Sequence, residues 1–252
     1  MLKLRVLALA FVGGTALGAT ALWAQTIDIR PPRPEHEAVR AWVDEVTALL
    51  RSNAMASNLK VLDAAYGKVE LTTGKTVAKP SELAQLLRLQ APAYPGLAYS
   101  PAVVVLTGSG VPDPSWDSGF GNTENSSASV MPVNYRNPVL RMAIGRVHLD
   151  RYVNGNQVER SCAINTMAHE ITHTLTNMPG PPFTYLFTDN GPAGSTAVAT
   201  LLIGAAAQCT FLRNAGRITT DAQFTSCVAK FGTVQPFQSN SCNDYADTAA
   251  FP

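Results

Sequence analysis

The sequence has almost no excess of charge of either sign. Its 252 residues include 19 Lys and Arg against 18 Asp and Glu, a formal net charge of +1. Proteins that bind nucleic acid or an anionic membrane surface through their overall charge need a clear basic excess. Internal repeats and coiled-coil heptads are absent as well. We therefore expect no nucleic-acid partner, and recognition has to depend on a local site.

Cysteine is scarce, and the four cysteines all lie between positions 162 and 242. Their spacing lacks the close C-x₂₋₄-C pair of thiolate zinc modules, so we predict two disulfide bonds in an exported chain. Three pairings are possible. We favour Cys209 with Cys227, because these two close a short local loop. The second pair is then Cys162 with Cys242.

The N-terminal segment has the layout of a secretory signal peptide. Lys3 and Arg5 precede an apolar run, and small residues follow as far as Ala24. This pattern predicts a signal peptide over 1–24, with cleavage near Ala21 as a second position. A retained membrane anchor is the alternative, but small residues interrupt the run. We expect a secreted or periplasmic protein without stable membrane insertion after cleavage.

The remaining residues predict an α+β fold, with a small sheet, helices packed across it and a helical C-terminal part. Residues 25–252 are enough for one domain, or for two lobes over 25–179 and 180–252. The stretch Gly108–Pro132 has no steady period and is expected to be irregular. Oligomeric state stays open. The expected helices are residues 35–53, a helix that begins near the cap-like Ser81, and an all-apolar helix over 197–207. The expected strands lie in 68–78, 103–106 and 138–153.

The clearest chemical signal is the pentapeptide His169-Glu170-Ile171-Thr172-His173. Two histidines four residues apart project from one helix face and can share a metal ion, and imidazole suits zinc. Glu170 lies about 100° further round the helix, beside the metal, where it can take a proton from water and return it to a leaving group. The pattern predicts a hydrolytic zinc site; a metal site without catalysis is the alternative.

The residues around this pentapeptide favour a helix. Apolar side chains recur at three- and four-residue spacing, and Pro179 and Gly180 are expected to end the helix. The apolar stripe consists of Ile164, Met167, Ala168, Ile171 and Leu175.

Histidine and glutamate are both absent downstream of His173. A catalytic zinc normally has three protein ligands and an open position for water. Asp189 follows the helix within a short loop and is our preferred third ligand, although an aspartate in D-N-G also suits a turn. His148, on the expected strand before the motif, is the alternative. The later aspartates are Asp221, Asp244 and Asp247.

A developing oxyanion needs a hydrogen-bond donor in addition to the metal. Tyr185, four residues before Asp189, is our predicted catalytic tyrosine, and Tyr245 is a second candidate. Tyrosines also commonly pack with the hydroxyl bonded to another group, which is the alternative role for both.

The segment CAINTMAHEITHTLTN resembles the catalytic helix of the zincin metallopeptidases. The resemblance implies one Zn²⁺, with His169 and His173 as ligands and Glu170 as general base. It also implies a mixed sheet before the helix, whose edge strand lines the cleft and pairs with an extended peptide. Residues 139–150, VLRMAIGRVHLD, are in the right place for that strand.

A zinc site with aspartate as its third ligand is similar to the site of the aspzincins, the deuterolysin-like secreted endopeptidases. In this chain Asp189 directly follows Thr188, so the G-T-x-D-x-x-Y-G pattern of that family is absent. The sequence thus predicts a secreted zinc peptidase that acts on a peptide or protein substrate. Two other functions stay open: a non-catalytic, metal-stabilised binding protein, and a zinc amidase acting on cell-wall peptides.

Overall fold

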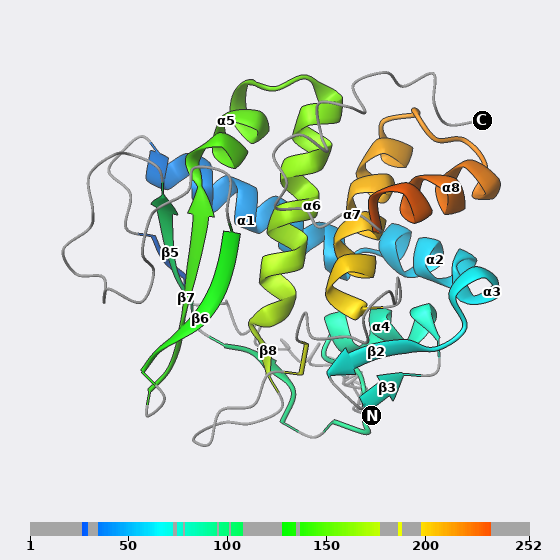
Figure 1. Ribbon diagram of the computed structural model, residues 1–252, viewed down its shortest axis with the longest axis horizontal. Helices are drawn as coiled ribbons and strands as arrows, with labels where there is room; N and C mark the ends of the chain where they lie inside the picture. Colours follow the sequence, from blue (N-terminus) through cyan, green and yellow to red (C-terminus); the bar gives the residue numbers. More distant parts are fainter. Residues whose placement is uncertain are drawn as a thin grey trace, which may run out of the picture.

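The computed structural model of the chain has an α+β fold in which helices predominate over a small sheet (Figure 1). This confirms the predicted class. Figure 1 places strands β5, β6 and β7 on one side of the molecule, with helices α6 and α7 next to each other beyond them. The structure describes residues 27–29, 35–72, 75–77, 79–94, 96–100, 102–107, 128–134, 137–176, 186–187 and 198–232.

The described elements are helices and short strands, which follow one another in short runs along the chain. The helices are α1 (Glu35–Arg51), α2 (Asn53–Val61), α3 (Asp63–Tyr66), α4 (Pro80–Leu87), α5 (Arg146–Asn154), α6 (Gln157–His173), α7 (Ala199–Asn214) and α8 (Asp221–Gly232). The strands are β1 (Ile27–Ile29), β2 (Val69–Thr72), β3 (Lys75–Val77), β4 (Ala98–Tyr99), β5 (Ala102–Thr107), β6 (Ala128–Asn134), β7 (Asn137–Gly145) and β8 (Leu175–Thr176).

The largest sheet is mixed, with the strand order β1-β5-β7-β6. Strands β1, β5 and β7 are parallel, and β6 pairs antiparallel with β7. The prediction that residues 139–150 form the edge strand is wrong, because β7 lies inside the sheet. The successive residues Met142, Ala143 and Ile144 are all buried, so both faces of β7 are covered.

Among the described strands of this sheet, β1 and β6 lie at the two edges, and β6 falls partly in the segment predicted to be irregular. Residues Ala128 to Pro132 pair with Ile144 to Leu140 of β7, while 108–127 lie outside the described residues. The strand reads ASVMPVN and lacks an alternating apolar pattern. Its proline suits an edge strand, since proline has no N–H to donate to a neighbouring strand.

In the sequence, helix α5 lies between strand β7 and the motif helix α6. The predicted strand over 138–153 is therefore correct only as far as Gly145, whose extended backbone precedes the first turn of α5. His148 lies on this helix and is buried, not on a strand. The buried residues His148, Leu149 and Tyr152 follow helical spacing. In a segment this short, the sequence pattern of a half-buried strand and that of a half-buried helix are hard to tell apart.

The predicted amphipathic helix is confirmed as α1, and the predicted all-apolar helix as α7. Twelve of the residues of α7, from Ala199 to Leu212, are buried. In the part of the chain that the structure describes, no helix is both long and apolar enough to cross a membrane. Buried hydrophobic residues from α1, α2, α4, α6, α7, α8 and the sheet form one core.

The start of α4 differs from the prediction. Lys79 occupies the N-cap position, and Ser81 lies inside the first turn. Ser81 donates from its backbone N–H (2.8 Å) and its hydroxyl (2.7 Å) to the carboxylate of Asp63. The cap is thus supplied by a side chain from the preceding helix, a long-range contact that leaves no local pattern in the sequence.

A polar cluster joins α1, α5 and α6. The Tyr152 hydroxyl donates to Glu45 Oε2 at 2.6 Å, and Arg160 Nη2 donates to the same oxygen at 2.7 Å. The Tyr152 ring also stacks on Trp42, with 5.4 Å between ring centroids. Burial, together with the hydrogen bond to Glu45, raises the pKa of Tyr152 to about 12.

One of the two predicted disulfides is confirmed. Cys209 on α7 is bonded to Cys227 on α8, and both are fully buried. Cys162, on α6, is itself disulfide-bonded. Its predicted partner Cys242 lies outside the described residues, so that pairing stays a prediction. The signal peptide predicted over 1–24 also lies outside them.

Candidate metal centre

The motif lies on α6, a helix that begins with a capping box. Asn156 Oδ1 accepts from the backbone N–H groups of Val158 (2.9 Å) and Glu159 (3.1 Å), and Glu159 Oε2 accepts from the Asn156 N–H at 2.7 Å. Every residue of α6 from Ser161 to His173 is buried. A helix buried on all sides is a rigid support for the side chains that it carries.

The end of α6 is held by a short antiparallel ladder. The helix ends at His173, earlier than expected from Pro179 and Gly180, and Leu175 of the predicted stripe belongs to β8. The Ser100 N–H donates to the Thr174 carbonyl at 2.7 Å, next to the β4–β8 pair. This ladder ties the C-terminal turn of the motif helix to the segment before β5.

The two histidines of the motif converge. His169 Nε2 and His173 Nε2 are 3.2 Å apart, and both rings are buried. Two nitrogens each about 2.0–2.1 Å from a tetrahedral zinc would be about 3.3 Å apart. The pair therefore fits the bite of one metal ion. The same separation also suits an N–H···N hydrogen bond between the rings when no metal is bound.

A backbone carbonyl determines the tautomer of His173. Its Nδ1 is 3.1 Å from the carbonyl oxygen of Phe187, and a carbonyl can only accept. His173 Nδ1 therefore carries the proton, and Nε2 presents its lone pair toward His169. Metal-binding histidines are commonly oriented in this way. A main-chain acceptor has no residue signature, so sequence reasoning could not have found it.

Glu170 lies beside the histidine pair, as the helical spacing predicts. Its Oε1 is 4.0 Å from His169 Nε2, and its side chain is almost fully buried. The carboxylate is thus close to the nitrogen that would hold a metal without lying between the two rings. From this position it can exchange a proton with a molecule bound next to that nitrogen.

The described residues do not supply a third metal ligand beside His169 and His173. Within the described ranges, no group of three or more His, Cys, Asp or Glu side chains could hold a metal ion. His148 is thus not gathered with the two motif histidines, and Asp221 forms an exposed ion pair with Arg213 on the far part of α7. The other aspartate candidates, Asp189, Asp244 and Asp247, lie outside the described residues, and so do the predicted oxyanion donors Tyr185 and Tyr245.

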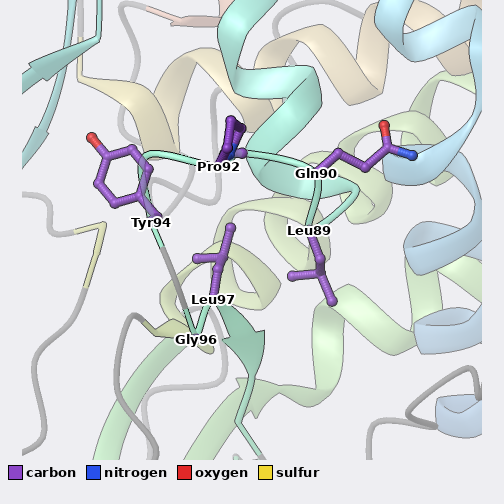
Figure 2. Close-up of a pocket in the computed structure, with 7 residues that line it drawn as sticks. Leu89, Gln90, Pro92, Tyr94, Gly96 and Leu97 are labelled. Carbon is purple, nitrogen blue, oxygen red and sulfur yellow. The ribbon is translucent and has the colours of Figure 1, made fainter.

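A surface pocket of about 410 Å³ lies in the connection between α4 and β4 (Figure 2). In Figure 2 the side chains of Leu89 and Leu97 point into it from opposite ends of the connection. None of its lining residues belongs to the motif helix, so the pocket contributes no group to the metal centre. Its lining consists of Leu89, Gln90, Ala91, Pro92, Tyr94, Gly96 and Leu97.

Comparisons with protein-family models, with curated proteins and with solved structures find no match to this chain. The chemistry of the centre therefore has to be inferred from its own residues and geometry.

Proposed function

We propose that the chain is a secreted zinc-dependent peptidase whose centre is built on α6. The observation that carries this proposal is the convergence of His169 Nε2 and His173 Nε2 at 3.2 Å, with Glu170 Oε1 4.0 Å from the first nitrogen. Two neutral imidazoles and an adjacent buried carboxylate are the donor set and the base of a metal-assisted hydrolase.

Each motif residue has a separate role in the proposed reaction. His169 and His173 hold the metal through Nε2, and the Phe187 carbonyl keeps the second ring in the required tautomer. When bound, zinc supplies a Lewis acid that polarises a carbonyl and lowers the pKa of water. Glu170 accepts a proton from the attacking water on its carboxylate and returns it to the leaving nitrogen of the cleaved bond.

The position of Phe187 supports Asp189 as third ligand. The Phe187 carbonyl is bonded to His173, and the Leu186 N–H donates to the Leu175 carbonyl at 3.4 Å. Asp189 follows Phe187 by two residues in the sequence, and two residues span at most about 7 Å. We therefore propose Asp189 as the third ligand, and Tyr185, which directly precedes Leu186 in the sequence, as the hydrogen-bond donor to the oxyanion.

The substrate is proposed to be an extended peptide that pairs with β6. Among the described strands β6 has one neighbour, β7, and it contacts the motif helix α6. An edge strand beside a catalytic helix can bind a peptide through main-chain hydrogen bonds. This assigns to β6 the role that the sequence pattern had assigned to residues 139–150.

Export is proposed from the cysteines. The Cys209–Cys227 disulfide is of the kind that persists in oxidising compartments. This agrees with the signal peptide predicted over 1–24.

The test is the metal content and peptidase activity of the purified chain with three variants. The wild type should hold about one zinc per chain. His169→Ala and Asp189→Ala should lose it, because each removes a ligand. Glu170→Gln should keep the zinc and lose about 10²- to 10⁴-fold in peptide cleavage, since the base is neutral in that variant.

The outcomes separate the parts of the proposal. Full cleavage by Glu170→Gln would remove the mechanism. Zinc retained in Asp189→Ala but lost in His169→Ala would reject only the third ligand. A wild type that binds no zinc after reconstitution would reject the peptidase itself.

A further inference from the structure

Strand β8, which directly follows the motif helix, is bonded to other segments on both of its edges (Figure 1). On one edge it pairs with β4. Because the Ser100 N–H donates to the Thr174 carbonyl, Tyr99 and Leu175 face each other as a non-hydrogen-bonded pair. The Leu175 carbonyl therefore points away from β4, and on that other edge it accepts from the Leu186 N–H at 3.4 Å.

The segment 186–187 is thereby joined to the end of the motif at two points. Leu186 donates to Leu175, and one residue later the Phe187 carbonyl oxygen lies 3.1 Å from His173 Nδ1. The bond from Leu186 is long, since N–H···O bonds usually measure about 2.7–3.2 Å between the heavy atoms, so it is weak. Main-chain bonding to β8 is therefore not enough to fix the Phe187 carbonyl.

The side chain of Phe187 provides a stronger attachment. It is fully buried and is one of the largest side chains that the described part of the chain buries completely. It belongs to the same hydrophobic core as Met167, Ala168 and Ile171 of α6. A large ring in a close-packed core has few alternative positions. Because the ring and the carbonyl are attached to the same Cα, burial of the ring also restricts the carbonyl.

We infer that the Phe187 side chain is a positioning residue for His173. Its burial holds the main-chain carbonyl against Nδ1, and the proton kept on Nδ1 leaves the Nε2 lone pair for a metal. The ring of His173 is thus oriented before zinc arrives, and less freedom is lost on binding. The role as a ligand-positioning residue rests on the proposed zinc site, whereas the orientation of the ring does not require zinc.

The experiment applies two measurements to the full chain and three variants. Competition with a chelator gives the zinc affinity. NMR of the imidazole nitrogens in the zinc-free protein, at a pH where the ring is neutral, shows which nitrogen of His173 carries the proton. Phe187→Leu leaves a smaller apolar side chain and should weaken zinc binding about 10-fold, with both tautomers of His173 present. Phe187→Ala removes the anchor and should weaken zinc binding about 100-fold.

The matched control is Phe224→Leu, which makes the same change elsewhere in the core. Phe224 is also fully buried, and it lies on α8, where the Arg213 guanidinium is 5.7 Å from the centre of its ring. Phe224→Leu should lower the free energy of unfolding in urea, because it removes buried apolar volume. Its zinc affinity and the tautomer of His173 should match those of the wild type.

The outcomes separate positioning from folding and from the peptidase proposal. A wild-type zinc affinity and tautomer in Phe187→Leu would overturn the positioning role. Equal weakening in Phe187→Leu and Phe224→Leu would overturn it too, because the effect would then come from stability. A zinc-free wild type with the His173 proton on Nε2 would also overturn it. A wild type that binds no zinc would reject the peptidase, and the tautomer of His173 in the variants would still decide whether Phe187 orients the ring.

Discussion

At the residue scale, burial and a hydrogen bond raise the pKa of the Tyr152 hydroxyl. Its hydroxyl is buried and donates to a carboxylate, so the ionised form is disfavoured and its pKa rises to about 12. In the unfolded chain the pKa returns to about 10. Between these two values the folded protein holds a proton that the unfolded chain has lost.

This difference makes stability fall with rising pH in a defined window. The contribution is fully present below about pH 10 and is lost as pH rises toward 12, so Tyr152 should lower the free energy of unfolding by about 1 kcal/mol at pH 11 relative to pH 9, after allowance for solvent screening. Urea unfolding at both pH values measures it. In Tyr152→Phe the decrease should be smaller by that amount; an identical decrease in both proteins would contradict the assignment.

At the scale of the helices and strands, α6 and α7 approach each other closely at Gly204. Glycine in a helix interior usually costs stability, so a change to alanine should stabilise by about 0.5–1 kcal/mol. At Gly204 the expected sign is reversed. The new Cβ would overlap Asn165 Oδ1, and overpacking of this kind costs about 1–3 kcal/mol. Gly204→Ala should therefore lower the free energy of unfolding in urea.

A second variant shows whether this contact is the cause. Asn165→Ala removes the atom that the new methyl group would meet, although it also leaves Gln208 without its amide donor. In that background Gly204→Ala should be neutral or stabilising. Destabilisation of the same size in both backgrounds would place the clash elsewhere on α7.

On the scale of the whole molecule, the Cys209–Cys227 disulfide joins α8, the last helix that the structure describes, to α7. Cys209 and Cys227 are 18 residues apart and connect α8 to the buried helix α7. A cross-link over a loop of this length contributes about 3 kcal/mol, mainly by restricting the unfolded chain. The double variant Cys209→Ala/Cys227→Ala should lose about that much free energy of unfolding. An unchanged unfolding midpoint would show that the cross-link adds nothing.

Patterns that repeat within one element could be predicted from the sequence. The four-residue spacing of His169 and His173 places both on one helix face, and the structure brings their Nε2 atoms together. The uninterrupted apolar composition of α7 predicts burial on all sides, and burial is what the structure has. The short separation of Cys209 and Cys227 predicted their disulfide. In each case neighbours in the sequence determine the result.

Positions that depend on distant segments could not be predicted in the same way. Whether β6 or β7 lies at the sheet edge depends on which strands pair, and α5 takes its helical form in a stretch that also alternates like a strand. The strand assignment of His148 failed for this reason.

The sequence by itself determined which residues could carry the chemistry, because helical periodicity places His169, Glu170 and His173 relative to one another. Only the tertiary structure decided what surrounds them: the Phe187 carbonyl at His173 and the register of α7 beside α6. A main-chain acceptor has no residue type, and the register of two helices comes from contacts between residues that are far apart in the chain. Neither leaves a local pattern in the sequence.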